Sequence, residues 1–341
     1  MVRRLVFVLL LGSFTSNVCF AQEIEKPDSA TGLVSPQDNL SAKESVQPKE
    51  DWTKLQVDRS VLKPLVSGAL LGKADFPAYT RELIRLEWRH GDPVDIYLIK
   101  PRSVDHPRVV LYLYSFPADT DRFMDDGWCR RATREGMAAV GFVSALTGVR
   151  FRNRPMKEWF ISELQESMGS TAHDVQLIID YLESRNDLSA DRVGFFGQGS
   201  GASIAILAAA ADPRIGVLDL LNPWGDWPDW LKTSPVVPDE ERANYLTSGF
   251  LQKASTVDPI AFLPQLKDRL LRLQQIRDDP DTPPVARDRI AEVTPKDQLV
   301  QYKDKAAHRE AWSAAGISGW IASQFGLKHQ PVAVEATNGL P

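Results

Sequence analysis

The chain has 341 residues, of which 43% are hydrophobic and 25% are charged, and its formal net charge is −5. This length and balance suit one large globular domain or two small ones, and they exclude a disordered, fibrous or polytopic membrane protein. The mild acidity and the absence of basic runs argue against a nucleic-acid-binding protein, because such binding depends on neutralising phosphates.

The first 21 residues have the composition of a secretory signal peptide. Arg3 and Arg4 precede an apolar run over 5–11, and the stretch 18–21 offers small residues for cleavage before Gln22. The apolar run is too short to span a bilayer. We therefore expect an exported protein, periplasmic or secreted, whose net charge changes from −5 to −7 when the two arginines are removed.

Composition also divides the rest of the chain. Residues 22–50 are rich in Ser, Pro, Glu and Lys and nearly free of aromatic residues, which predicts a flexible linker. The main domain is expected over 51–328, and residues 329–341 read as a loose tail.

Few residues suggest metal or thiol chemistry. Only Cys129 remains after signal cleavage, so we expect a packed thiol and no intramolecular disulfide. His173 and Asp174 lie on a predicted helix and are interpreted as a packed surface pair. Without an H-x-x-H, an H-E-x-x-H or a cysteine pair, we expect no metal and no cofactor.

Strand and helix patterns alternate along the domain. Apolar and charged residues alternate over 84–88 and 94–98, which predicts two half-exposed antiparallel strands. Buried strands are expected over 109–114, 137–145, 192–196, 215–221, 270–276 and 299–302, and helices over 122–134, 171–184, 200–211 and 309–324. This order predicts an α/β fold with a mostly parallel central sheet and helices on both faces. Segment 222–267 interrupts the order and is expected to be an inserted cap over the carboxyl edge of the sheet.

The most informative segment is 187–215, DLSADRVGFFGQGSGASIAILAAAADPRI. A strand, a glycine-dense turn and a helix of small residues follow one another there. The segment resembles the nucleophile elbow of the α/β hydrolases, especially the dienelactone-hydrolase and acetyl-esterase branches, and the resemblance covers roughly residues 80–325. It implies the α/β-hydrolase fold, an esterase-like scaffold and a small ester or acyl ligand.

The elbow lacks the residue on which its chemistry depends. In the pattern G-x-nucleophile-x-G, Gly197 and Gly201 are the flanking glycines, so the central position is Gly199. A residue with a side chain is strained in this turn by about 1–3 kcal/mol, whereas glycine adopts it freely. Gly199 therefore favours loss of acyl-enzyme chemistry. In the alternative, Ser200 acts as nucleophile after a one-residue shift, since triads are defined by geometry.

The resemblance implies where the remaining catalytic groups lie. Asp279 stands in a D-P-x-x-P turn that matches the acid of the triad, and His308 stands where the family places its base. The oxyanion donors would be the N–H of Ser200 and one from the loop that contains Ser115 and Phe116. Structural roles are the alternative: Asp279 in a turn and His308 as a helix cap.

The inserted segment carries Trp224, Trp227 and Trp230 within seven residues. These rings either form a substrate-binding wall or pin the insertion to the sheet. If the elbow is inactive, the chain would be a non-catalytic ligand-binding protein whose pocket is framed by these three tryptophans and His308.

A dinucleotide-binding protein is a weaker alternative. Residues 197–202 also read G-x-G-x-x-A, and Asp219 lies about where the ribose-binding acid would be. The motif follows several earlier strands, however, and does not open the domain. The elbow interpretation explains more of the surrounding residues.

Overall fold

The described residues form a nine-stranded mixed sheet. The structure is a computed structural model that describes residues 49–117, 121–145, 161–316 and 318–327, all within a compact unit that spans 48–341. The strands are β1 (Ala69–Asp75), β2 (Tyr79–Leu86), β3 (Val94–Pro101), β4 (Arg108–Leu113), β5 (Ala138–Phe142), β6 (Ser189–Gln198), β7 (Ile215–Leu221), β8 (Leu270–Ile276) and β9 (Leu299–Tyr302).

The strand order explains which part of the sheet carries the site. The order is β1-β2-β3-β5-β4-β6-β7-β8-β9. The pairs β1–β2, β2–β3 and β3–β5 are antiparallel, and the pairs from β5 to β9 are parallel. The predicted sequence of antiparallel strands followed by a parallel sheet is confirmed. In such a sheet, the loops at the carboxyl ends of the parallel strands hold the ligand or catalytic groups.

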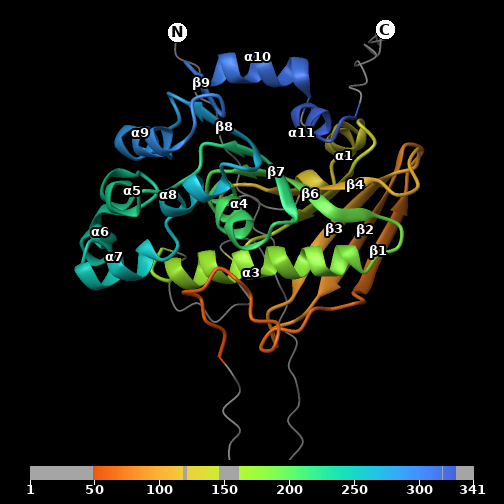
Figure 1. The fold of residues 1–341 in the computed structure, drawn as a ribbon, viewed down its shortest axis with the longest axis horizontal. Helices are drawn as coiled ribbons and strands as arrows, with labels where there is room; N and C mark the ends of the chain where they lie inside the picture. The colour runs from red at the N-terminus through yellow and green to blue at the C-terminus, as the bar shows by residue number, and fades with distance from the viewer. Residues whose placement is uncertain (1–48, 118–120, 146–160, 317, 328–341) are drawn as a thin grey trace, which may run out of the picture. The chain divides into compact units, whose positions relative to one another are not determined.

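Helices cover both faces of the sheet, as the sequence predicts. Figure 1 shows α3 along one side and α1, α10 and α11 on the other. The larger helices are α1 (Asp126–Thr133), α3 (Leu164–Glu183), α4 (Ser200–Ala211), α9 (Pro284–Val293), α10 (Lys305–Ala315) and α11 (Gly319–Gln324). Neighbouring residues of β4 show the two faces: Leu111 packs in the core that contains α3 and α4, whereas Tyr112 packs in the core that contains α1 and α11. None of the helices among the described residues is long and apolar enough to cross a membrane.

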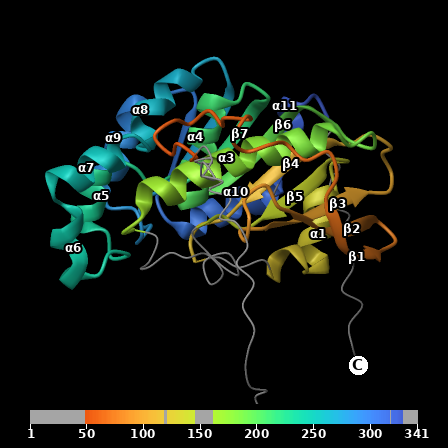
Figure 2. The same cartoon turned by 90° about the horizontal axis from the view of Figure 1, so that it is seen from below.

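The insertion between β7 and β8 is helical. It contains α5 (Trp227–Thr233), α6 (Asp239–Tyr245), α7 (Ser248–Ser255), α8 (Pro259–Phe262) and the 3₁₀ turn η2 (Leu263–Leu266). Figure 2 shows α5, α6 and α7 gathered at one end of the sheet, next to α8 and α9. The elements α8 and η2 pack on α4, and α7 packs on α3. The inserted cap segment is therefore present.

Several boundaries differ from the predictions for identifiable reasons. The sequence does not predict β1, because this edge strand is exposed along nearly its whole length and lacks an apolar face. It predicts one final helix, but Gly316, with φ 78°, separates α10 from α11. The helix α3 begins at Leu164, seven residues before the predicted start at 171.

An amino-terminal strap, residues 49–62, lies along α3 (Figures 1 and 2). The predicted surface pair is in fact buried: His173 is 1% exposed and Asp174 is 0% exposed. The ring nitrogens of His173 face the Glu50 carboxylate at 2.6 Å and the Lys54 carbonyl at 2.7 Å. Both of these partners accept hydrogen bonds, so the ring bonds to both only when each nitrogen carries a proton.

Arg89 completes this buried group of charges. Its guanidinium donates two hydrogen bonds of 2.6 Å to Glu50 and is also paired with Asp174. The strap gains two further attachments from α3, because Gln176 accepts the Val57 N–H at 3.2 Å and donates to the Leu55 carbonyl at 2.7 Å. The strap is therefore held by paired buried charges and by hydrogen bonds between its backbone and the Gln176 side chain.

The strap should loosen in acid. Burial raises the pKa of Glu50, but hydrogen bonds from Arg89 and His173 outweigh burial and lower this pKa from 4.5 to about 2. A carboxylate whose folded pKa is depressed stabilises the fold fully above its unfolded pKa and loses that contribution as the pH falls toward the folded value. We expect the free energy of unfolding in urea to fall between about pH 4.5 and pH 2 by more in the wild type than in Glu50→Gln. Equal pH dependence in the two proteins would contradict this, and Glu240→Gln, at an exposed carboxylate of α6, serves as the control.

Candidate functional site

The elbow turn lies at the carboxyl edge of the sheet, between the end of β6 and the start of α4. Gly199 occupies the turn with φ 54° and ψ −121°. This is a region of backbone conformation that residues with a side chain rarely adopt. The turn therefore keeps the strained geometry of a nucleophile elbow, with glycine at the position where the nucleophile would stand.

The space beside Gly199 is already filled. A Cβ atom built on Gly199 would lie 2.2 Å from Ser115 Oγ, 2.7 Å from Ser115 Cβ and 3.3 Å from Trp224 Nε1. Ser115 follows the end of β4, the strand next to β6. Its hydroxyl is buried and has no hydrogen-bond partner in the part of the chain that the structure describes. The Ser115 side chain thus takes the volume that a nucleophile side chain at position 199 would need.

Ser200 does not stand in the place of a nucleophile. Its side chain is buried, with 1% exposure, and its Oγ accepts a hydrogen bond of 2.9 Å from the Phe116 N–H. The loop donor that the sequence assigns to the oxyanion hole is therefore engaged by a side chain of the protein itself. An oxyanion in this position would have to displace the Ser200 hydroxyl.

Among the described residues, His308 packs on aromatic rings and forms no hydrogen bond to Ser200 or Asp279. It lies in the first turn of α10, is 8% exposed, and packs between Tyr302 and Trp312 with ring-centroid distances of 5.0 and 5.6 Å. Its Nε2 atom is buried without a hydrogen-bond partner among the described residues. Burial lowers the pKa of His308 below its ordinary value. The cap of α10 is Asp304, whose side chain accepts from the Ala307 N–H at 2.8 Å.

Asp279 has the structural role in a turn that the sequence analysis gives as an alternative to a catalytic one. Its carboxylate accepts a hydrogen bond of 3.1 Å from the Thr282 N–H. Burial raises the pKa of Asp279, and the bond from Thr282 offsets only part of that effect. Among the described residues, no hydrogen bond joins Asp279 to His308. The acid and the base that the resemblance implies are therefore not coupled in this structure.

The three tryptophans of the insertion are core residues. Trp224, Trp227 and Trp230 are 1%, 1% and 0% exposed. The Trp230 ring contacts Trp224 and Trp227 at centroid distances of 4.8 and 5.6 Å. The indole N–H of Trp227 donates to the Val257 carbonyl, and that of Trp230 donates to the Asp281 carbonyl. The expectation of a substrate-binding wall is therefore corrected: these rings pin the insertion to the domain, because they are buried against it.

Asp219 and Cys129, which the sequence analysis also considers, are both buried. Asp219 is 1% exposed and is paired with Arg272 at 2.6 Å and with Gln274 at 2.7 Å, so its carboxylate is not available to a ribose. Cys129 is a buried free thiol whose Sγ contacts the Phe123 carbonyl at 3.3 Å. Burial raises the pKa of Cys129, which makes the thiol unreactive. Within the described residues, no group of three His, Cys, Asp or Glu side chains could hold a metal ion.

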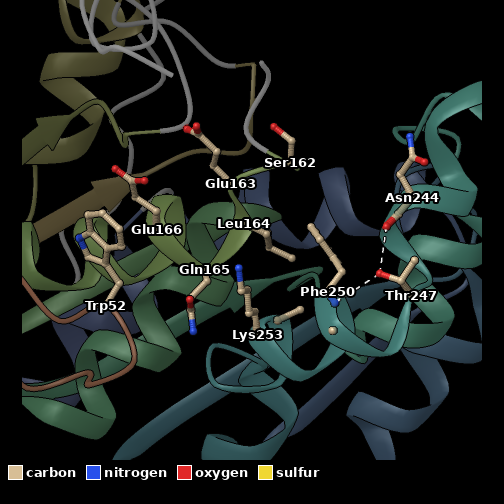
Figure 3. Close-up of a pocket in the computed structure, with 12 residues that line it drawn as sticks. Trp52, Ser162, Glu163, Leu164, Gln165, Glu166, Asn244, Thr247, Phe250 and Lys253 are labelled. Carbon is tan, nitrogen blue, oxygen red and sulfur yellow. Dashed lines mark hydrogen bonds between the residues drawn. The ribbon is translucent and has the colours of Figure 1, made fainter. Parts of the chain in front are cut away.

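An open cleft, which the sequence does not predict, lies between α3 and α7 (Figure 3). Its volume is about 490 Å³. It is lined by Trp52 of the strap, by residues 162–166 around the start of α3, and by side chains that include Asn244, Phe250 and Lys253. We call it the α3–α7 cleft. No short motif signals it, since its walls come from three distant parts of the chain.

Comparison with known proteins identifies the architecture. No protein-family model and no curated protein sequence matches the chain. Acetyl xylan esterase 1 from Thermoanaerobacterium sp. JW/SL YS485 has a similar structure, with a TM-score of 0.58, 14% identity, and coverage of 75% of this chain and 88% of that one. The chain has the α/β-hydrolase fold.

Other solved structures agree with this assignment. An acetyl xylan esterase from Paenibacillus sp. R4 has a TM-score of 0.57 at 15% identity and covers 72% of this chain and 86% of its own. The 2,6-dihydroxy-pseudo-oxynicotine hydrolase has a TM-score of 0.51 at 18% identity, with 74% and 70% coverage. At these identities the likeness concerns the fold, and the chemistry has to be judged from the residues of this chain.

Restoring a serine at the elbow should destabilise the protein. Gly199→Ser combines backbone strain of about 1–3 kcal/mol with an overlap against Ser115 of similar size. We expect a loss of about 2–6 kcal/mol in the free energy of urea-induced unfolding. Adding Ser115→Gly removes the overlap but not the strain, so the double variant should recover roughly half of the loss. Gly249→Ser is the matched control, because a Cβ there meets nothing within 4 Å. If Gly199→Ser lowers the free energy of unfolding by no more than Gly249→Ser does, the overlap with Ser115 is refuted.

Proposed function

We propose that this chain is a non-catalytic binding protein built on an α/β-hydrolase scaffold. The observation that carries the proposal is the elbow itself. The nucleophile position is Gly199, and the Ser115 side chain occupies the space beside it. A scaffold of this kind can retain a ligand site after the attacking group is lost, because binding and bond cleavage depend on different groups.

The other parts of the catalytic machinery support the same proposal. Acyl transfer needs a nucleophile next to a base, an acid that orients the base, and free donors for the oxyanion. Here the Phe116 N–H donates to Ser200, and His308 makes no hydrogen bond to Ser200 or Asp279 among the described residues. Removal of the nucleophile alone lowers the rate of a serine hydrolase by roughly 10⁶-fold. The described geometry therefore favours binding over cleavage.

The ligand that we propose is a small ester or acyl compound. Support comes from the fold and from the two acetyl xylan esterases among the similar structures. We also propose that the chain is exported, because residues 1–21 have the pattern of a cleavable signal peptide. Amino-terminal sequencing of the protein recovered outside the cytoplasm should begin at Gln22, and a chain that still begins at Met1 would contradict export by cleavage.

An active esterase that uses Ser200 is the second candidate. One observation favours it: the Ser200 hydroxyl lies 2.9 Å from the Phe116 N–H, which is the donor expected to bind an oxyanion. Among the described residues, however, no hydrogen bond joins the Ser200 hydroxyl to His308. For Ser200 to attack, it would have to leave the Phe116 N–H and meet His308.

An esterase assay separates the two candidates. The mature protein should hydrolyse p-nitrophenyl acetate and p-nitrophenyl butyrate no faster than its Ser200→Ala and His308→Ala variants, because no described group is placed to form an acyl-enzyme. Initial rates measured against buffer check this expectation. Wild-type turnover that both alanine variants abolish would establish Ser200 as the nucleophile and overturn the proposal.

A further variant tests whether His308 and Asp279 can still act as base and acid. The double variant Gly199→Ser with Ser115→Gly should stay inactive, because His308 and Asp279 are not coupled. Activity in this double variant, with a silent wild type, would mean that the base and the acid can still assemble and that only the attacking group is missing. A circular dichroism spectrum confirms that each variant is folded before its rate is interpreted.

A further inference from the structure

The α3–α7 cleft is separate from the residues of the elbow and has the size of a ligand site. Its volume of about 490 Å³ lies within the roughly 300–1,000 Å³ of small-molecule sites. The cleft lies between the first turn of α3 and the helix α7 (Figure 3) and is partly open to solvent. A partly open site can bind a ligand that extends beyond it.

The lining combines aromatic rings with side chains that can form hydrogen bonds. Trp52 stands at one end of the cleft and Asn244 and Thr247 at the other, and Leu164 and Phe250 lie between these ends (Figure 3). The Gln165 amide and the Lys253 ammonium also lie between the two ends. The amide of Gln165 is fixed by a hydrogen bond of 2.8 Å to Thr256, which leaves its carbonyl oxygen as an acceptor.

The charges of the lining do not favour a strongly charged ligand. The lining carries two carboxylates at the start of α3, Glu163 and Glu166, and one ammonium group, Lys253 on α7, so both signs of charge are present. A polyanion would meet Glu163, and a polycation would meet Lys253. Both groups can instead bond to hydroxyls, the ammonium as donor and the carboxylate as acceptor.

The position of Trp52 is built into the fold. The strap brings this residue against α3, where a Cβ on Gly169 would lie 2.8 Å from the Trp52 carbonyl oxygen and 3.1 Å from its Cβ. Only glycine allows this close approach. The strap is also held at Glu50 and Lys54, on either side of Trp52, by Arg89 and His173. The aromatic end of the cleft is therefore held in place before any ligand arrives, which reduces the entropy lost on binding.

The geometry points to the α3–α7 cleft as a binding site for a neutral polyhydroxylated ligand, a short oligosaccharide, that stacks on the face of the Trp52 ring opposite the Lys49 ammonium, which lies 5.3 Å from the ring centroid. A sugar ring presents C–H groups on its faces and hydroxyls at its edge, which matches a lining of aromatic rings and hydrogen-bonding side chains. The inference goes beyond the proposed function and does not depend on whether the elbow is inactive.

Calorimetric titration of the mature protein with xylotriose and with cellotriose tests this site. We expect binding in the millimolar range or tighter by the wild type. Affinity should fall about tenfold in Trp52→Leu and change by less than about threefold in Trp52→Phe, because phenylalanine keeps an aromatic face. Absence of binding by the wild type to both sugars, or equal affinity in Trp52→Leu and the wild type, would overturn the inference.

A second pair of variants tests the strap without changing a lining residue. Gly169→Ala should push Trp52 away from α3 and weaken sugar binding about as much as Trp52→Leu does, whereas Gly72→Ala, where a Cβ meets nothing, should have no effect. Unchanged sugar binding in a folded Gly169→Ala variant would contradict the role of the strap. Since neither titration involves ester cleavage, a failure here leaves the proposal for the elbow untouched, and esterase activity would leave this inference untouched.

Discussion

The close approach of the elbow to the end of β4 constrains the whole carboxyl edge of the sheet. A Cβ on Gly201 would lie 2.2 Å from the Leu113 carbonyl oxygen, and one on Gly199 would lie at the same distance from Ser115 Oγ. The elbow and the end of β4 are thus packed so tightly that side chains at positions 199 and 201 would overlap them. In an active elbow, the nucleophile needs room and a base beside it. Here the Ser115 side chain has that room, and the loop after it donates its N–H to Ser200.

The architecture does not depend on the chemistry of this edge. The two cores of the sheet are formed by residues of β4, β5 and β6 with α3 and α4 on one face and with α1 and α11 on the other. The insertion is pinned by its own tryptophan cluster. Because burial of these apolar side chains supplies most of the stability, the fold can persist when the catalytic groups are not assembled. This separation explains how one chain can have an esterase-like scaffold and an elbow without a nucleophile.

The sequence predicts the parts of the structure whose signal is local. The glycine pattern around Gly199 and the apolar periodicity of β4 and α4 lie within single segments, and they predict the fold and the tight turn at Gly199. Other features depend on contacts across the chain. His173 is interpreted as a surface residue because its partners, Glu50 and Lys54, lie 123 and 119 positions away. The triad members have the right order and spacing, but spacing cannot show that the Asp279 carboxylate turns to Thr282.

The most direct test of the account is covalent labelling with a fluorophosphonate, which reacts with activated serine hydroxyls. Intact mass spectrometry of the mature wild-type protein should show no adduct under conditions that fully label an active serine esterase, because neither Ser115 nor Ser200 forms a hydrogen bond to a base among the described residues. A stoichiometric adduct that peptide mapping places on Ser200 or Ser115 would contradict the account, since it would show that a nucleophile is activated at this edge of the sheet.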